Sequence, residues 1–411
     1  MTGRAARLPA YALFAALLAS AGLPIYIHAP KFYVDEYGVS LTALGSVLFG
    51  LRLLDVVQDP ALGWLAQKLR DKRGTAVTVA GAVMALAMLG LFAMPAPVAP
   101  VLWFALMLTL VFSAFSFLTI CFYAQGVATA DSLPGAGHLT LARWRETGAL
   151  LGVCLASVAP LLLGVALDRP FAGFAVGFAI LALWATVAMR GEWRAAALPM
   201  ESGFGTVLRD AQARRLLLIA LVNAAPVAVT STLFLFYVEL ALEAPGWEGP
   251  LLLLFFLAAA AAAPLWGILA ERHGPRRVLL VAMALGIASF GGAMLLGPGD
   301  VALFALVCLA SGAVLGADLT LLPAMFASRM AQISPSAAEG FGLWSFVSKL
   351  TLAFAAVALL PALERAGLQT AAGTSSDTSI SLLIWFYAGV PCALKLLAIA
   401  LLASAKDVET S

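Results

Sequence analysis

Long, uninterrupted apolar runs recur along the whole sequence, and they limit what the chain can fold into. Most runs extend over about 20 residues or more, the length that a helix needs to cross a bilayer. Hydrocarbon offers no water to backbone groups, so only helices and closed barrels span it. A barrel would show alternating segments of roughly ten residues. These runs are instead rich in Leu, Ala and Phe, and they predict an all-α polytopic membrane protein.

The overall composition agrees with lipid as the solvent. Of the 411 residues, 63% are hydrophobic and 11% are charged, whereas a soluble domain is about half apolar and about a quarter charged. The three histidines are scattered, and no P-loop, nucleophile elbow or metal-ligand spacing occurs. The four cysteines fall inside apolar runs, where small buried side chains are expected. We therefore expect neither an enzyme, nor a cofactor, nor an ATP-driven pump.

About twelve spans of bilayer length are expected. A polar stretch divides them, which predicts an N-terminal six-helix bundle at 1–190, a cytoplasmic central loop at 191–213 and a C-terminal six-helix bundle at 214–411. The predicted spans are 8–29, 41–66, 75–96, 98–128, 140–166, 170–190, 214–240, 249–270, 277–297, 300–328, 338–362 and 379–404.

The distribution of Lys and Arg predicts the orientation. If both termini are cytoplasmic, the cytoplasmic side holds about six times as many basic residues as the other side. Arg4 and Arg7 precede an apolar run that is long enough to remain as a span. The basic residues form topology signals and no patch, so nucleic acid is not an expected partner. These features predict a multi-pass protein of the bacterial inner membrane, expected to be a monomer.

The two halves of the sequence look related. "GWLAQKLRDKRG" follows the second span and "GILAERHGPRR" follows the eighth, with Gly63 and Gly267 at equivalent places. Two parallel six-helix repeats are a transporter architecture. The second loop resembles the cytoplasmic loop signature of the major facilitator superfamily, in which Glu271 and Arg272 could latch the cytoplasmic side. The alternative is that these charges only set orientation, and Gln67 stands where the first loop would need an acid.

The second span carries the strongest local signal. Arg52, Asp55 and Asp59 are spaced i, i+3 and i+7, so they share one helix face. A charge at the bilayer centre costs about 3 kcal/mol on insertion scales and usually marks a functional path. Two carboxylates one turn apart repel unless a cation or proton intervenes, and Arg52 can offset only one. Pro60 lacks an N–H and frees the carbonyl of Val56 to face an ion. The alternative is an ion-pair cluster that only fixes helix packing.

The motifs around this span resemble a known transporter family. "KFYVDEYGVS", followed by "LRLLDVVQDPALGW", is similar to the R-x-x-D-x-x-x-D-P-x-x-G pattern of the glycoside–pentoside–hexuronide:cation symporters, the melibiose-permease-like branch of the major facilitator superfamily. The resemblance implies that superfamily's fold. It also implies that Asp55 and Asp59 bind a coupling cation, an alkali cation such as Na⁺ or else H⁺, with Gln58 and Ser116 as further ligands.

The resemblance also implies a solute pocket, although one that departs from the family. The matching positions are Thr119, Tyr123, Arg143 and Lys349. The family holds sugar hydroxyls with carboxylates on its first and fourth helices, but these positions fall near Ser20 and at Thr119 here. An acidic stretch of the tenth helix is also missing. Because a pocket that loses its acceptors binds hydroxyls less well, the scaffold matches the family while the disaccharide pocket does not.

Further polar residues lie inside predicted spans. Asp318 and Lys349 could pair with each other, as a structural salt bridge or as a gate. Lys395 is expected to extend its ammonium toward a membrane interface. His28 is expected to be solvated near the outer end of the first span, and Asn223 could line a cavity or bond to a neighbouring helix.

Together these features predict a secondary transporter that couples Na⁺ or H⁺ to the symport of a small polar solute. A cavity with basic groups and without sugar-binding acids would suit a uronate or another organic anion, and a sugar is the family's usual solute. One alternative is a lysolipid transporter on the same fold. A second is a membrane sensor or assembly factor that does not transport. The expected partners are the solute and the lipid bilayer.

Overall fold

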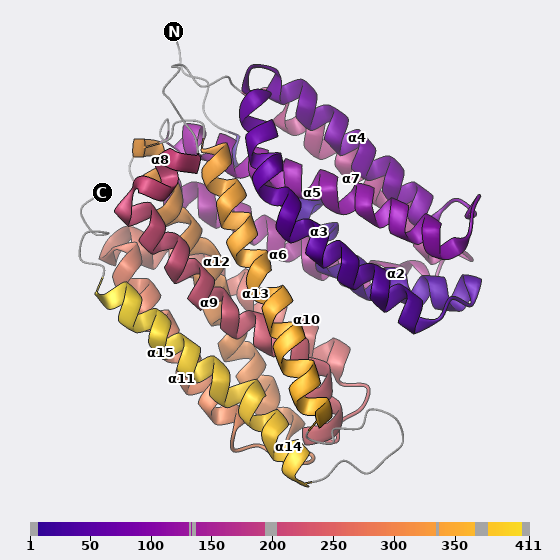
Figure 1. Ribbon diagram of the computed structural model, residues 1–411, viewed down its shortest axis with the longest axis vertical. Coiled ribbons are helices and arrows are strands. Elements are labelled where there is room, and N and C mark those ends of the chain that lie inside the picture. Colours follow the sequence, from indigo (N-terminus) through magenta and orange to yellow (C-terminus); the bar gives the residue numbers. More distant parts are fainter. Residues whose placement is uncertain are drawn as a thin grey trace. The chain divides into compact units, whose positions relative to one another are not determined.

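The computed structural model describes residues 7–130, 133, 137–193, 204–333, 337–365 and 377–404, and no strand occurs among them (Figure 1). The helices are α1 (Leu8–Ser20), α2 (Leu23–Tyr37), α3 (Leu41–Lys68), η1 (Arg70–Lys72), α4 (Arg73–Phe92), α5 (Pro100–Ala130), α6 (Gly137–Leu163), α7 (Pro170–Met189), α8 (Phe204–Arg209), α9 (Ala211–Phe236), η2 (Tyr237–Ala241), α10 (Glu248–His273), α11 (Pro275–Ala293), α12 (Val301–Ile333), α13 (Ala338–Arg365), α14 (Asp377–Ile384), η3 (Trp385–Gly389) and α15 (Val390–Ala403).

Every predicted span coincides with helix, which confirms the all-α prediction. The first span is built from α1 and α2, and the last from α14, η3 and α15. Among the described residues, eight helical segments are long and apolar enough to cross a membrane by length and composition alone. The helices α3 and α6 are outside that group, and their sequences carry several charged residues. Asp55 and Asp59 lie on α3, and Arg145 and Glu146 lie on α6.

Local sequence signals explain several helix ends. The hydroxyl of Ser40 accepts the N–H of Ala43 at 3.3 Å and caps the start of α3. Gly38 ends α2 in the left-handed region, at φ +63°, which glycine adopts without strain. Gly274 separates α10 from α11 at φ +84°, and Pro275 opens α11 at a position that needs no N–H.

The described chain forms two compact units. Unit 1 comprises residues up to Asp210 together with Ala327–Phe346, and unit 2 comprises Ala211–Phe326 and the residues from Val347 onward. The predicted domain boundaries at 190 and 214 stay a prediction, and residues 194–203 of the predicted central loop lie outside the described residues.

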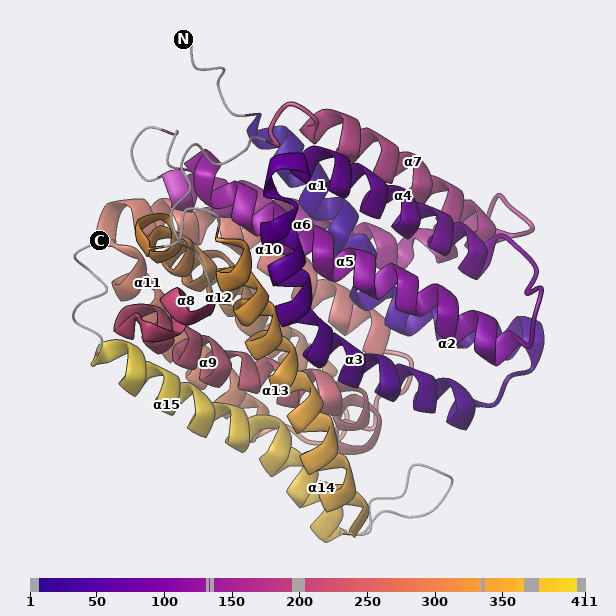
Figure 2. The ribbon, with the colours of Figure 1, turned by 45° about the horizontal axis from the view of Figure 1, so that its top comes forward.

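Unit 1 is held by close helix packing. The helix α1 packs on α6 and α7, while α4 packs on α5 and α7 (Figure 2). Gly148 and Gly152 of α6 face α1, and a Cβ on either would overlap the backbone of Ala12 or Ala16. Small residues let two helix backbones approach in this way, which is how membrane helices gain packing energy.

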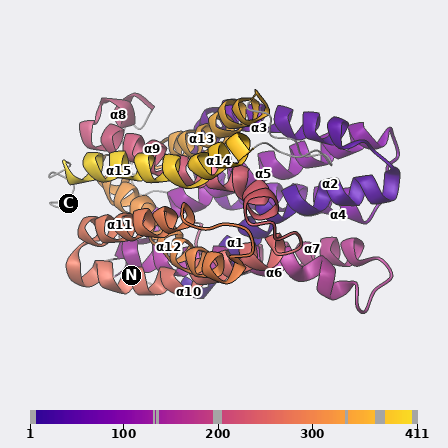
Figure 3. The ribbon, with the colours of Figure 1, turned by 90° about the horizontal axis from the view of Figure 1, so that it is seen from below.

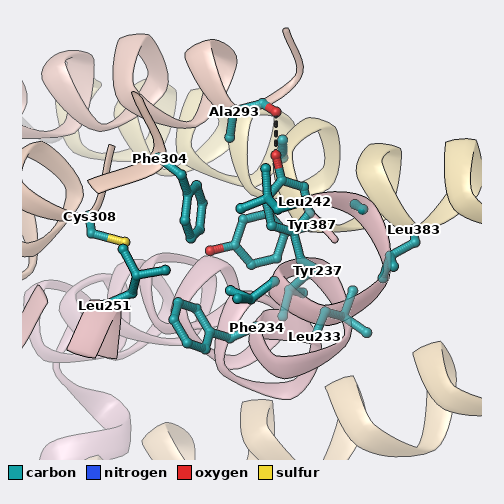
Figure 4. Close-up of a cluster of buried hydrophobic side chains, with 14 of the residues drawn as sticks. Leu233, Phe234, Tyr237, Leu242, Leu251, Ala293, Phe304, Cys308, Leu383 and Tyr387 are labelled. Carbon is teal, nitrogen blue, oxygen red and sulfur yellow. Dashed lines mark hydrogen bonds between the residues drawn. The ribbon is translucent and has the colours of Figure 1, made fainter. Parts of the chain in front are cut away.

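Unit 2 has α15 running along α9 and α11 (Figure 3). Its aromatic core lies where two π-helical turns meet (Figure 4). Tyr237 of η2 stacks on Tyr387 of η3 with 4.1 Å between ring centroids, and the Tyr237 hydroxyl donates to the carbonyl of Ala293 at 2.7 Å. Phe304 of α12 packs against both tyrosines. This core fixes the end of unit 2 that the π turns occupy.

Candidate functional site

The two acids predicted on the second span lie on α3 and are buried. Asp55 is 4% exposed and Asp59 is 0% exposed. The helix continues through Pro60 without interruption. Because proline has no N–H, the carbonyl of Val56 receives no hydrogen bond from position 60. The side chain of Arg52 lies outside the described residues, and its predicted role beside the acids stays a prediction.

An amide and a hydroxyl extend the acidic face of α3 toward α5. The Nε2 of Gln58 donates to Oδ1 of Asp55 at 2.9 Å, and the hydroxyl of Ser113 donates to Oε1 of Gln58 at 2.9 Å. Ser116, the predicted hydroxyl ligand, is fully buried on α5 one turn after Ser113. Sequence reasoning missed Ser113, although its i, i+3 spacing to Ser116 places both on one helix face.

The second acid is held from a distant part of the sequence. The hydroxyl of Ser345, on α13, donates to Oδ2 of Asp59 at 2.6 Å. The two helices approach closely because both carry glycine: a Cβ on Gly63 would lie 3.2 Å from the Cα of Gly342 and from the carbonyl oxygen of Ala338. Nothing in the sequence pointed to this contact, because 286 positions separate Ser345 from Asp59.

The segment Ala327–Phe346 makes further contacts within unit 1. Arg329 of α12 donates through Nε to Oδ1 of Asp210 at 3.0 Å, and its Nη2 bonds to the other carboxylate oxygen. The ring of Phe341 lies 4.9 Å from that of Tyr123, centroid to centroid. The segment is therefore held in unit 1 by an ion pair, an aromatic contact and the hydrogen bond from Ser345 to Asp59.

A buried cluster of three polar side chains joins α5 and α6. Nε of Arg145 donates to Oε1 of Glu146 at 2.7 Å, and the hydroxyl of Tyr123 donates to the same oxygen at 3.2 Å. The guanidinium of Arg145 also lies 3.9 Å from the centre of the Tyr123 ring, a cation–π distance. Arg145 and Glu146 are 5% and 4% exposed, whereas the predicted pocket arginine, Arg143, is partly exposed.

Several buried polar atoms of unit 1 have no hydrogen-bond partner among the described residues. They belong to α5, α6 and α13, and they are Oγ1 of Thr119, Nη2 of Arg145, Oγ1 of Thr147 and Oε2 of Glu339. Buried polar groups are nearly always bonded, so each unpartnered atom calls for an explanation such as a ligand or water. Thr119 was predicted as a pocket residue, and the other three were not.

Two predictions about polar residues of unit 2 are wrong. Asp318 does not pair with Lys349: its Oδ2 accepts a 2.5 Å bond from Nζ of Lys395, and its Oδ1 has no partner among the described residues. Lys395 does not reach for a membrane interface either, because it is 1% exposed and also donates to Oδ1 of Asn223 at 2.6 Å. Burying an ammonium is costly unless an opposite charge and hydrogen bonds compensate for the lost water, and Asp318 and Asn223 provide both. Lys349 is partly exposed, and its predicted role in the pocket stays a prediction.

The predicted latch residues lie on the last turn of α10. Both Glu271 and Arg272 are exposed there, and the latch stays a prediction. A neighbouring basic residue of the same motif does have a defined place. Arg276 donates to the carbonyls of Leu402 and Ala403 at 3.2 and 2.6 Å, which caps the C-terminal end of α15.

His28 is partly buried and not solvated as expected. Its Nε2 lies 3.0 Å from the carbonyl oxygen of Ser157, and its ring packs against Phe171 and Phe174.

A group of three or more His, Cys, Asp or Glu side chains that could hold a metal ion does not occur among the described residues. Beside the carboxylates of Asp55 and Asp59, the side chains of Gln58, Ser113 and Ser345 supply an amide and two hydroxyl groups.

Comparisons with known proteins place this fold among the major facilitator superfamily (MFS) transporters. Two structures of a bacterial homologue of the iron transporter ferroportin in the outward-facing state, one with soaked iron, each have a TM-score of 0.69, at 15% and 16% identity. Their alignments cover 98% and 97% of this chain and 100% and 99% of those chains. The MFS transporter FucP in the outward conformation has a TM-score of 0.63 at 14% identity, covering 95% and 98% of the two chains. These likenesses show the fold.

The family comparison covers nearly all of the sequence. No curated protein matches the chain. The family described as MFS/sugar transport protein matches residues 9–406. This is a multi-pass membrane transporter with the twelve-helix MFS fold, and it belongs to the MFS/sugar transport protein family.

Proposed function

We propose that this protein is a cation-coupled symporter of the glycoside–pentoside–hexuronide:cation type, which moves a small polar solute together with Na⁺ or H⁺ by alternating access. The observation that carries the proposal is the pair of buried acids one turn apart on α3, Asp55 and Asp59. The sequence motif that resembles this symporter family supports it further. In this proposal the termini are cytoplasmic, and the membrane is the bacterial inner membrane.

The chemistry of the cluster suits a small hard cation. Asp55 accepts an amide N–H from Gln58, and Asp59 accepts a hydroxyl from Ser345. A hydrogen bond from a neutral group does not neutralise a carboxylate, and two carboxylates one turn apart repel each other. A cation or proton removes that repulsion, and carboxylate, amide and hydroxyl oxygens are the ligands that hard cations prefer. Gln58, Ser113 and Ser116 lie on the α3 and α5 faces that would supply them.

The solute is proposed to bind beside Tyr123, Arg145 and Glu146. The carboxylates with which the family binds sugar hydroxyls are missing from this sequence. Glu146 is a buried acid at a different position that could take their place. The Nη2 group of Arg145 and the hydroxyl of Thr119 each have no hydrogen-bond partner among the described residues, so both could bond to a solute. An acid, an arginine, a hydroxyl and an aromatic face together suit a hydroxyl-bearing solute such as a sugar or a uronate.

Coupling follows if the cation and the solute stabilise the same arrangement of α3, α5 and α13. The hydroxyl of Ser345 on α13 bonds to Asp59, and Phe341 on the same helix packs on Tyr123. A cation at Asp59 therefore acts on the helix that also covers the proposed solute cluster. By linkage, a solute that favours this arrangement raises cation affinity by the same factor.

The proposal is tested by the effect of cations on the thermal stability of purified protein. Titration with Na⁺, Li⁺ or H⁺ at constant ionic strength should raise the apparent Tm, since a cation at about 100 times its Kd adds about 2.7 kcal/mol. Asp59→Asn should remove the rise because it removes the charge and keeps the side-chain shape. Asp71→Asn, on the exposed α3–α4 connection, is the matched control and should leave the rise intact.

A second arm of the same experiment addresses the solute. Wild-type protein is screened against sugars, uronates, organic acids and lysolipids, each with and without Na⁺. Glu146→Gln and Arg145→Lys should lose the response to the solute while they keep the response to the cation. The proposal fails if no cation shifts the Tm of the wild-type protein, or if Asp59→Asn responds as the wild type does. A response to lysolipids alone would favour a lipid substrate instead.

A further inference from the structure

Unit 1 has an apolar groove on its surface between α3, α4 and α5. Its volume is about 440 Å³. The groove is hollow because small residues lie between large ones: Ala76 and Ala80 of α4 and Ala114 of α5 leave space beside the leucines of α3. It extends along α4 from Lys72 to Val83, which is about 16 Å at 1.5 Å per residue.

The rim of the groove has the character of a lipid-facing surface. Val79 and Leu110, which line it, are 58% and 37% exposed. In a chain that spans a membrane, apolar side chains exposed on the flank of a span contact acyl chains. The shape and lining of the groove therefore suit one hydrocarbon chain lying along α4.

One end of the groove is positively charged. The connection from α3 to α4 carries four basic residues and one acid, Asp71, for a net charge of +3. Lys68 lies 5.0 Å above the Trp64 ring, Arg70 lies 3.7 Å from Asp71, and Arg73 is buried and donates to Gln125. Lys72 lines the groove with the apolar stem of its side chain and is exposed, and its ammonium has no hydrogen bond or ion pair with any described residue. Its ammonium is therefore available to an anion at the end of the groove.

We propose that this groove is a binding site for an anionic phospholipid, with one acyl chain along α4 and the phosphate at Lys72. The apolar groove and the basic end match the two parts of such a molecule, and juxtamembrane basic residues attract anionic head groups. The inner wall of the groove includes Ser113, whose hydroxyl donates to Gln58, which in turn donates to Asp55. The bound lipid therefore packs against the side chain that supports the acidic face of α3.

The test uses the purified full chain after delipidation in detergent. Native mass spectrometry counts retained lipid, and the apparent Tm is measured with added phosphatidylglycerol, phosphatidylcholine or glycerol phosphate. Lys72→Gln removes the charge, with Lys72→Arg as its control. Ala80→Phe fills the groove, with Ala261→Phe as its control, because Ala261 is an exposed alanine of α10 in unit 2. Ala76→Leu is a second filling variant if Ala80→Phe does not fold.

Phosphatidylglycerol should be retained and should raise the Tm more than phosphatidylcholine. Lys72→Gln should lower that preference about five-fold, Lys72→Arg should keep it, and the filling variants should lose retention of both lipids while Ala261→Phe keeps it. The proposal is overturned if the two lipids behave alike, or if a filled groove retains as much phosphatidylglycerol as Ala261→Phe. A Tm shift with glycerol phosphate equal to that with the whole lipid would also overturn it, because it would indicate a site for a free anion.

Discussion

The ion pair between Lys395 and Asp318 is the most enclosed pair of opposite charges described in unit 2. Both side chains are buried, and Asn223 provides the ammonium with a second oxygen. Gly286 of α11 lies beside the lysine stem, since a Cβ there would be in ordinary contact with Cε of Lys395 at 3.8 Å. The pair is therefore enclosed by packed helices as well as held by charge.

Removing one partner of this pair should destabilise unit 2 strongly. Lys395→Met leaves the carboxylate of Asp318 buried without its cation, which costs about 3–5 kcal/mol. The double variant Asp318→Asn with Lys395→Met should recover most of that loss, because neither charge remains. The measurement is the apparent Tm in detergent, with Arg190→Met as the exposed control. A single variant as stable as the double variant would contradict this account.

At the residue scale, the sequence predicted that Asp55 and Asp59 share one helix face, because acids are costly in lipid. Both are buried on α3, and their role in cation binding stays a prediction. The pocket arginine was predicted as Arg143, whereas Arg145 is the buried one, because residues two apart point to different sides of a helix. The role of Arg143 stays a prediction. The partner of Asp318 could not be predicted from the sequence either. It depends on how α9, α12 and α15 pack together, and no local sequence pattern indicates that packing.

At the scale of elements, the crossing of α3 and α13 is set by two glycines. A Cβ on Gly342 would lie 3.2 Å from the carbonyl oxygen of Asp59, and one on Gly63 would lie equally close to α13. The hydrogen bond from Ser345 to Asp59 depends on this approach. The sequence located both helices within a few residues, but it gave no signal that they pack together.

A larger residue at the crossing should separate the helices and expose the acid. Gly63→Leu is expected to raise the maleimide reactivity of a cysteine placed at Ser345 about ten-fold, because the covered position opens to solvent. Gly177→Leu, on α7 where a Cβ would meet open space, is the control and should leave the labelling rate unchanged. Labelling rates on purified protein measure both, and equal rates would show that the glycines do not hold the crossing. The factor of ten corresponds to about 1.4 kcal/mol between covered and open forms.

At the scale of the whole molecule, the two compact units do not coincide with the two halves of the sequence. The segment Ala327–Phe346 lies in the C-terminal half of the sequence, yet its contacts place it in unit 1. The sequence predicted twelve helices and their order correctly because apolar length is a local property. It could not predict this grouping, since the ion pair of Asp210 with Arg329 and the bond of Asp59 with Ser345 join distant parts of the chain.

The segment should therefore respond to a cation together with α3. Hydrogen exchange measured with and without saturating Na⁺ should slow in residues 338–346 and in α3, by about ten-fold if the cation adds about 1.4 kcal/mol to local stability. The rest of α13, from Val347 onward, should change less. Asp59→Asn should remove the effect at both places. If hydrogen exchange slowed in α3 alone, the segment would not respond to the cation, and this prediction would be wrong.

The π turn at Trp385–Gly389 has a consequence for insertions and deletions in this chain. A π turn takes in one more residue than an α turn, and each residue of an α-helix advances the direction of the side chains by about 100°. Deleting one residue of η3 would therefore restore a regular α turn and leave the facing of α15 relative to α14 nearly unchanged. A deletion within α15 between η3 and Lys395 has no such extra residue to remove, so it would turn Lys395 by about 100° away from Asp318. The π turn thus makes η3 the place in this helix that tolerates the loss of one residue.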